Sequence, residues 1–333
     1  MKDATTLPDP DLPEYLERAP LAYANFNFID SPDGRPFRIL SEYQEPLSRF
    51  RRERVQDTVV FFGSARFNAL DISRAELELL DNTGSIQPAP DHEQPATSEQ
   101  IAKGEASELQ HRRAEAAVEM AAYYEDARKL AYLVATWAKT LPGPRHRYVI
   151  TSGGGPGIME AANRGAYEAG AKTIGLNIKL PFEQHPNRYI TPALNFEFDY
   201  FFMRKFWFAY LAKALVIFPG GFGTFDEAFE ILTLAQTDKL SSNITILFYG
   251  SDYWKSLINF DLLVERGAIS PGDIDLFHFV DTPEEAFELL KTGLTRNNPI
   301  RPGHHNQEEL LGVSNEPAPS AQEVLGPDIA KTR

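Results

Sequence analysis

The chain has 333 residues, 43% of them hydrophobic and 12% aromatic, which is enough to fill a sizeable core, while 24 prolines indicate extended segments. A formal net charge of -14 excludes a general attraction to DNA, RNA or anionic lipid, so a phosphate ligand has to be held by a local site. The lack of cysteine excludes disulfides, thiolate metal sites and cysteine nucleophiles, and suits a reducing compartment. We therefore expect one large α/β domain with extensions.

The two ends of the chain differ in composition from the middle. Residues 1–55 carry prolines, charges and scattered aromatic side chains without a sustained helical or strand period, which predicts an arm that docks in part through its aromatic residues. Residues 297–333 are rich in Pro, Asn, Glu and Gly, which predicts a disordered tail. The acidic, proline-rich start has no apolar h-region and no apolar run is long enough to span a bilayer, so we expect a soluble cytoplasmic protein without a membrane partner.

Between these ends, strand-like and helix-like segments alternate over residues 56–296. The apolar run Thr58–Phe62, closed by Gly63 and Ser64, predicts a buried strand. The polar stretch 82–104 predicts an inserted loop, and Ala114–Leu141 predicts a long helix. The alternation predicts a doubly wound, Rossmann-like parallel sheet with helices on both faces. Further strands are predicted at 148–151, 173–178, 214–218 and 244–248.

A first glycine loop, Ser152-Gly-Gly-Gly-Pro-Gly157, follows the second predicted strand and opens a helix predicted from Ile158 to Ala166. Pro156 suits the first helical position, where its missing N–H costs nothing. Gly154 and Gly155 let a ligand approach bare backbone amides near a positive helix end. A tight strand-to-helix turn without a ligand would have the same sequence.

A second glycine loop, Phe218–Thr224, again lies between a predicted strand and a predicted helix, Phe225–Thr237. Two loops at the carboxyl ends of parallel strands belong to one edge of the sheet, where open α/β folds bind ligands. Neither loop has the G-x-G-x-x-G spacing and no G-K-[ST] sequence occurs, so dinucleotide and ATP-hydrolysis functions lose their main support. A monophosphate would suit one helix N-terminus formed by Gly220, Gly221, Gly223 and the Thr224 hydroxyl.

Glu227 is the first candidate chemical group. It lies one turn inside the helix that would hold a phosphate, so its carboxylate could orient water or stabilise positive charge at C1' of an attached sugar. The sequence from Thr224 to Glu227 is also an ordinary capping box, in which Thr224 caps the helix and Glu227 returns to the cap amide.

Arg204 and Lys205 are the second candidate, two adjacent cations at the start of a predicted apolar helix. Cations at a helix N-terminus oppose the helix dipole and want a compensating anion. An ion pair with Asp199 or Glu197 would explain them without a ligand. The sequence has no HExxH or comparable metal cluster and no G-x-S-x-G elbow, so a metal-free mechanism without an acyl-transfer serine is preferred.

The sequence Pro219-Gly-Gly-Phe-Gly-Thr-Phe-Asp-Glu227 fits the PGGxGTxxE motif of the LOG family at every fixed position, and Arg204-Lys205 resembles the second motif of that family. These are the cytokinin riboside 5'-monophosphate phosphoribohydrolases and the bacterial nucleotide 5'-monophosphate nucleosidases. The resemblance runs from about Val59 to Leu290. It implies hydrolysis of a nucleoside 5'-monophosphate to free base and ribose 5-phosphate through an oxocarbenium-like cation, with no cofactor and with a homodimer.

The resemblance also implies which residues act. Arg204 and Glu227 are the implied catalytic pair, with Arg204 either anchoring the ribose that carries the phosphate or assisting the departing base. Phe201 stands where the plant pattern has Met, and Glu160 stands where many members have Gly, which favours purine or general nucleotide salvage over hormone production. The expected substrate contacts are Ser64, Gly154, Gly155, Glu160, Glu183, Lys205, Gly220, Gly221, Phe222, Gly223, Thr224 and Thr233.

Two other interpretations of the sequence stay open. The chain could be a non-catalytic carrier of a nucleotide or of molybdenum cofactor, because such carriers use the same glycine loops. It could also be an interaction protein whose arms bind partners. The presence of both Arg204 and Glu227 argues against a carrier, whereas the prolines permit an interaction protein without indicating one.

Overall fold

The computed structural model describes residues 18–84, 98–180, 185–237, 239–240 and 244–297. The chain divides into two compact units, Met1–Gln44 and Glu45–Arg333. The described part of the first unit contains η1 (Ala22–Ala24), α1 (Phe26–Ile29) and the beginning of α2 (Arg35–Arg52). Within this unit Asn25 caps α1 by accepting a hydrogen bond from the backbone amide of Phe28.

Helix α2 corrects the prediction that residues 1–55 lack a sustained helical period. It has 18 residues and contains Pro46 in its interior. Proline inside a helix removes one backbone hydrogen bond, so the sequence pattern argued against a helix at this point. In the second unit, Leu47 and Phe50 of α2 are buried, and the Phe50 ring lies 5.3 Å from the Trp207 ring. Burial of this apolar stripe compensates for the proline.

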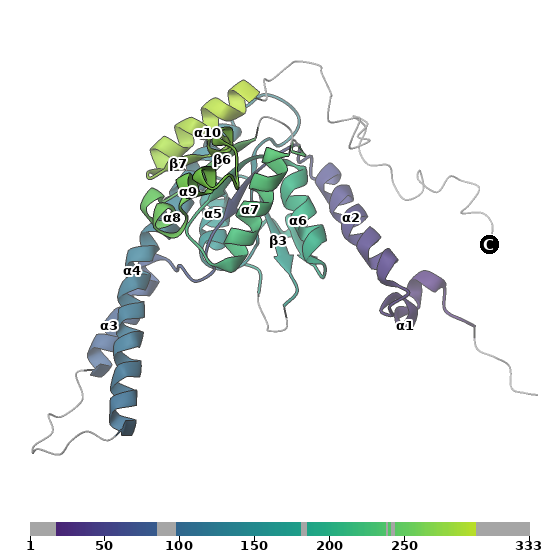
Figure 1. Ribbon diagram of the computed structural model, residues 1–333. Coiled ribbons are helices and arrows are strands. Elements are labelled where there is room, and N and C mark those ends of the chain that lie inside the picture. The colour runs from purple at the N-terminus through teal and green to yellow at the C-terminus, as the bar shows by residue number, and fades with distance from the viewer. Residues whose placement is uncertain (1–17, 85–97, 181–184, 238, 241–243, 298–333) are drawn as a thin grey trace, which may run out of the picture. The chain divides into compact units, whose positions relative to one another are not determined.

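The second unit is built on a seven-stranded sheet with the order β4-β3-β2-β1-β5-β6-β7, in which every neighbouring pair is parallel (Figure 1). This confirms the predicted doubly wound α/β fold, and the five predicted strands lie within two residues of their expected ends. The short strands β4 and β7 were not predicted. The strands are β1 (Thr58–Phe62), β2 (Val149–Ser152), β3 (Thr173–Ile178), β4 (Asn195–Phe198), β5 (Ala212–Ile217), β6 (Thr245–Tyr249) and β7 (His278–Val280).

The strand order contains one reversal. The chain proceeds from β1 outward through β2 and β3 to β4, and then returns so that β5 pairs with the other side of β1. The topological switch point therefore lies between β1 and β5. Open α/β sheets bind their ligands at such a point, outside the carboxyl ends of the strands.

Helices cover both faces of the sheet, because successive side chains of a strand point to opposite faces. Val59 and Phe61 of β1 belong to the core cluster formed with α4, α5 and α10, whereas Phe62 packs on Phe208 of α6, with ring centroids 4.9 Å apart. The remaining elements are α3 (Leu70–Gly84), α4 (Ser98–Ala138), α5 (Ile158–Glu168), η2 (Pro192–Leu194), α6 (Phe201–Tyr210), α7 (Phe222–Gln236), α8 (Ser251–Leu257), α9 (Phe260–Glu265), η3 (Pro271–Leu276) and α10 (Pro283–Asn297).

The stretch 82–104 is less loop-like than predicted. Helix α3 extends to Gly84 and α4 already begins at Ser98, while residues 85–97 lie outside the described residues. The long helix predicted from Ala114 is confirmed as part of α4, which ends at Ala138, and α3 runs beside its first half (Figure 1). The predicted tail also lies outside the described residues after Asn297. None of the described helices is both long and apolar enough to cross a membrane.

Candidate active site at the carboxyl edge of the sheet

The two glycine loops lie on either side of the end of β1 and are joined through Ser64. The Ser64 amide donates a hydrogen bond of 3.0 Å to the carbonyl of Pro219 in the second loop. The Ser64 carbonyl accepts a hydrogen bond of 3.0 Å from the amide of Ile158, the first residue of α5. Both loops therefore meet at the switch point, as expected from their positions after β2 and β5.

Buried asparagine side chains, which the sequence analysis did not single out, hold the first loop through hydrogen bonds. Asn187 Nδ2 donates to the carbonyls of Gly154 and Gly155, each at 3.1 Å, and to Asn163 Oδ1 at 2.9 Å. Asn163 also accepts from the Ser152 hydroxyl at 2.7 Å. These bonds direct the loop carbonyls into the protein. Pro186 marks a turn in the sequence, but nothing there indicates that the next side chain faces the loop.

The second loop is built around close contacts that require glycine. A side chain at Gly220 would collide with the Thr224 hydroxyl and approach the Ser64 amide. Tyr253 of α8, which the sequence analysis did not single out, donates its hydroxyl to the Gly220 carbonyl at 2.9 Å. Thr224 is buried. The loop is therefore fixed by packing before any ligand binds.

Helix α7 begins earlier than predicted, and this overturns the capping-box interpretation. Its first residue is Phe222, its N-cap is Gly221, and no side chain caps it. Thr224 lies inside the first turn, so it cannot act as the N-cap, and Glu227 is directed to Arg204 instead. Residues 221–223 are exposed, Phe222 to 97%, and apart from chain neighbours and the helix backbone no atom lies within 4 Å of where a Cβ would stand at Gly221 or Gly223. The amide end of α7 is thus open to an anion.

Arg204 of α6 is fixed between the two loops by three contacts. Its Nε donates to the Leu176 carbonyl of β3 at 2.7 Å, and its Nη1 lies 3.4 Å from Glu227 Oε1. The other guanidinium nitrogen lies where a side chain at Gly153 would stand. The Arg204 side chain is 11% exposed and that of Glu227 is 16% exposed. A largely buried pair therefore joins α6 to α7 beside the first glycine loop.

The burial of this pair changes the ionisation of both groups. Burial raises the pKa of Glu227 to about 7, and the neighbouring Arg204 limits that rise. Burial lowers the pKa of Arg204, while Glu227 favours its charged form. Arginine keeps its charge in proteins, so the pair consists of a permanent cation and a carboxyl that titrates near neutral pH. Carboxyls with such a pKa can take or give a proton under physiological conditions.

Lys205 pairs with other carboxylates of α7. Its ammonium lies 2.8 Å from Asp226 Oδ1 and 2.9 Å from Glu230 Oε2. Asp226 and Glu230 raise the pKa of Lys205 against the effect of burial, which is the largest single influence and lowers it. The sequence left open an ion pair of these cations with Asp199 or Glu197. In the structure, the ion pairs described here join Arg204 and Lys205 to carboxylates of α7.

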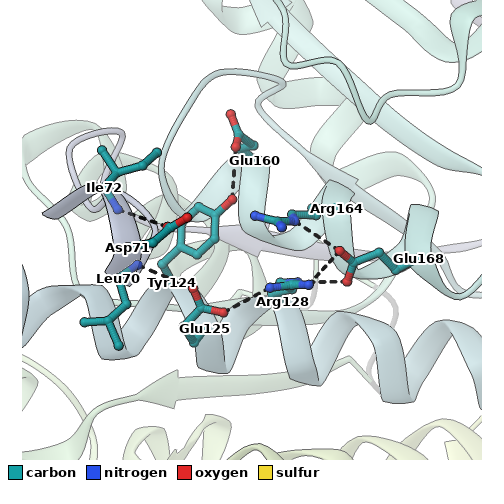
Figure 2. A network of polar contacts seen from close by, with 9 residues as sticks. All are labelled: Leu70, Asp71, Ile72, Tyr124, Glu125, Arg128, Glu160, Arg164 and Glu168. Atoms are coloured by element: carbon teal, nitrogen blue, oxygen red, sulfur yellow. Dashed lines mark hydrogen bonds and ion pairs between the residues drawn. The ribbon is translucent and has the colours of Figure 1, made fainter. Parts of the chain in front are cut away.

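Glu160, in the first turn of α5, belongs to a polar network that links α5 to α4 (Figure 2). The Tyr124 hydroxyl donates to Glu160 Oε1 at 3.0 Å. One helical turn further along each helix, Arg128 and Arg164 both bond the Glu168 carboxylate, at 2.7 Å and 3.0 Å. The network fixes the start of α5, where the first glycine loop ends, and so orients Glu160.

The structure does not describe one predicted contact and places another away from Glu227. Glu183 lies outside the described residues. Thr233 is an exposed residue of α7 whose hydroxyl donates to the Phe229 carbonyl at 2.7 Å, and it follows Glu227 by six residues, or about 9 Å along the helix axis. Within the described residues, no group of three or more His, Asp or Glu side chains is arranged to hold a metal ion.

The arrangement combines an open helix N-terminus, which favours an anion, with a buried carboxyl one turn further along the same helix. About 1.5 Å of rise per residue places Glu227 roughly 8 Å from the start of α7, the span of a phosphate joined to a small sugar. A carboxylate at that distance could stabilise a cationic centre or activate water.

The chain is similar in sequence to a family of known proteins. A family model described as possible lysine decarboxylase matches residues 159–290. The chain is 26% identical over 155 residues to the probable cytokinin riboside 5'-monophosphate phosphoribohydrolase LOGL6 of Oryza sativa, covering 46% of this chain and 61% of that protein. It is 25% identical to the cytokinin riboside 5'-monophosphate phosphoribohydrolase LOG1 of Arabidopsis thaliana, covering 50% of this chain and 78% of that protein.

A solved structure of the molybdenum cofactor carrier protein from Chlamydomonas reinhardtii is also similar, with 22% identity and a TM-score of 0.35, covering 52% of this chain and 88% of that one. The match to LOGL6 spans less than two thirds of that relative. The region matched by the family model contains Arg204, Glu227 and the second glycine loop. The resemblance to the LOG family that the motifs indicated is confirmed for this part of the chain.

Proposed function

We propose that this protein hydrolyses the N-glycosidic bond of a nucleoside 5'-monophosphate and releases the free base and ribose 5-phosphate. The observation that carries the proposal is the buried Arg204–Glu227 pair, which lies beside the first glycine loop and one turn inside the helix that the second loop opens. A carrier needs the loops but has no use for a carboxyl with a pKa near 7.

The phosphate is proposed to bind at the amide end of α7. The backbone N–H groups of Gly221, Phe222 and Gly223 have no helical acceptor, and the helix dipole adds positive potential there. The glycines leave the amides accessible. This local site accounts for binding a dianion by a protein of net charge -14.

Glu227 is proposed to stabilise the ribosyl cation that forms as the bond between C1' and the base nitrogen breaks. As water bonds to C1', Glu227 accepts its proton and passes it to the departing base, which leaves as the neutral free base. Arg204 keeps part of the Glu227 population ionised and is near enough to contact the ribose or its phosphate. Ser64, Gly154, Gly155 and Glu160 lie in or next to the two glycine loops and are proposed to contact the substrate. Thr224, Lys205, Glu183 and Thr233 remain proposed contacts on the resemblance alone.

The proposed substrate class is a purine or other common nucleotide. The relatives are named for cytokinin riboside monophosphates. Phe201 and Glu160 differ from the plant pattern, and this favours nucleotide salvage over hormone production. We also propose a homodimer in the cytoplasm. The exposed side chains of Phe201, Phe202 and Phe222 supply apolar area for an interface, and sedimentation velocity at several concentrations tests it.

The test is chromatography of free bases after incubating purified protein with AMP, GMP, CMP, UMP, isopentenyladenosine monophosphate and the corresponding nucleosides. We expect release from monophosphates only. The Glu227→Gln variant should bind AMP but turn it over at least a hundredfold more slowly, which is the usual scale for one catalytic acid or base. Glu230→Gln is the matched control, since Glu230 lies on the same helix and pairs with Lys205. Nucleotide binding without base release from any substrate would support a carrier.

A further inference from the structure

Asn177, at the carboxyl end of β3, presents an oriented hydrogen-bond acceptor to the candidate site. Its Nδ2 donates to Asn195 Oδ1 at 2.8 Å and to the Phe196 carbonyl at 2.9 Å. A backbone carbonyl only accepts, so the atom facing Phe196 has to be the NH2 group of the amide. Oδ1 therefore points away from β4.

On its other side the Asn177 amide lies against Gly154 of the first glycine loop. Oδ1 is the atom closest to where a side chain at Gly154 would stand, and Gly154 has a φ of +76°, which favours glycine. The Gly154 amide is already bonded to the Ser152 hydroxyl, and its carbonyl accepts from Asn187. Among the residues that the structure describes, no donor reaches Asn177 Oδ1. Asn177 is half-buried, and its two donor bonds hold the amide in place.

The neighbours of Asn177 indicate which part of a ligand it would meet. Gly153 lies against the Arg204 guanidinium, and the next residue, Gly154, lies against Asn177. Consecutive residues of the first glycine loop therefore contact Arg204 and Asn177. Leu176, which precedes Asn177, accepts the Arg204 Nε hydrogen bond. The free acceptor therefore adjoins the groups proposed to surround the sugar.

We propose that Asn177 Oδ1 accepts a hydrogen bond from a ribose hydroxyl of the bound nucleotide, and so selects ribonucleotides over deoxyribonucleotides. This inference rests on the proposed function, because it takes the ligand to be a nucleoside monophosphate. A neutral amide is suited to this task, because it supplies an acceptor without the negative charge that would repel the phosphate. Its two fixed donor bonds reduce the conformational cost of binding.

The test compares affinities for AMP, 2'-deoxyAMP, 3'-deoxyAMP and purine riboside monophosphate by calorimetry, using Glu227→Gln protein so that no substrate is consumed. In that background we expect AMP to bind about tenfold tighter than at least one deoxy analogue, the scale of one neutral hydrogen bond. Asn177→Ala should remove that preference. Asn177→Val, which suits a strand and has no hydrogen-bond acceptor, serves if the alanine variant does not fold.

Asn195→Ala is the matched control. It removes one of the two bonds that hold the amide but keeps Oδ1 and the bond to Phe196, so the preference for AMP should persist. The inference is overturned if Asn177→Ala weakens all four ligands equally, or if it alters only the preference for AMP over purine riboside monophosphate, which would assign Oδ1 to the base amine. If Glu227→Gln protein binds no nucleotide, the proposed function fails as well. If the wild type releases base but Asn177→Ala keeps the preference for AMP over the deoxy analogues, this inference alone is overturned.

Discussion

The raised pKa of Glu227 predicts a pH profile that distinguishes it from an ordinary carboxylate. If the ionised form stabilises the ribosyl cation, turnover follows the ionised fraction. Burial raises this pKa from 4.5 to about 7. About 9% of the groups are then ionised at pH 6 and about 91% at pH 8. The turnover number kcat should therefore rise roughly tenfold over these two pH units, whereas a carboxylate with its usual pKa would give a nearly flat profile.

The assay is the initial rate of base release at saturating AMP between pH 5 and 9. The phosphate itself ionises near pH 6, so it has to be separated from Glu227. Adenosine 5'-phosphorothioate, whose second ionisation is more acidic, should shift a phosphate-dependent limb and leave a Glu227-dependent limb in place. A profile that is flat from pH 6 to 8, or one that moves with the phosphorothioate, would refute the assignment of Glu227 as the ionised catalytic group.

The same group affects the free energy of unfolding. Because its pKa is higher in the folded protein than in the unfolded chain, the folded protein binds more protons between pH 4.5 and about 7, and stability falls as the pH rises through that window. Glu227→Gln removes this dependence. The difference in unfolding free energy between the variant and the wild type should shift by about 2 kcal/mol in favour of the variant from pH 5 to pH 8. Breaking the pair with Arg204 affects both pH values equally, so it drops out of this comparison. Urea unfolding at both pH values measures it.

Three further substitutions test other parts of the site. Gly221→Asp should abolish AMP binding because it places a negative charge at the proposed phosphate position, while Gly221→Asn, which is equally good as an N-cap, should bind AMP far better. The unfolding free energies of both variants should lie within a few tenths of a kcal/mol of the wild type. Equal affinities of the two variants for AMP would exclude a phosphate at this position. Gly153→Ala should displace Arg204 and lower kcat/KM more than tenfold, and unchanged kinetics would show that the guanidinium position is unimportant. Tyr124→Phe should cost about 1 kcal/mol of stability and raise KM if Glu160 contacts substrate, with an unchanged KM limiting Glu160 to a structural role.

The central fold could be predicted from sequence because its strands are buried on both faces. Thr58–Phe62 is an almost continuous apolar run closed by glycine, and Thr173–Ile178 is a largely apolar segment followed by a proline; they form β1 and β3 with the predicted bounds. The edge strand β4 has only four residues, alternately exposed and buried, and β7 has three. Segments this short carry too little periodicity to be distinguished from loops, and pairing with a neighbour defines them.

The site was predicted in its parts but not in its connections. The motif around Pro219–Glu227 located the second loop and singled out Glu227, since glycine spacing is a local property. The pairing of Arg204 with Glu227 was expected only from the family resemblance, because α6 and α7 are brought together by the fold and the capping box offered a local alternative. Asn187 and Asn177 were missed for the same reason. A lone asparagine has many uses, and only tertiary structure shows which atoms it faces.

The bridge at Ser64 consists of main-chain atoms, and this bears on how the site can change during evolution. Its amide and carbonyl connect the two loops, and the side chain takes no part in either bond. Every residue except proline carries the same two groups, so nearly any substitution at position 64 would keep the loops at a constant separation. Side chains around the loops can then diverge, while the spacing between the two loops is inherited with the backbone.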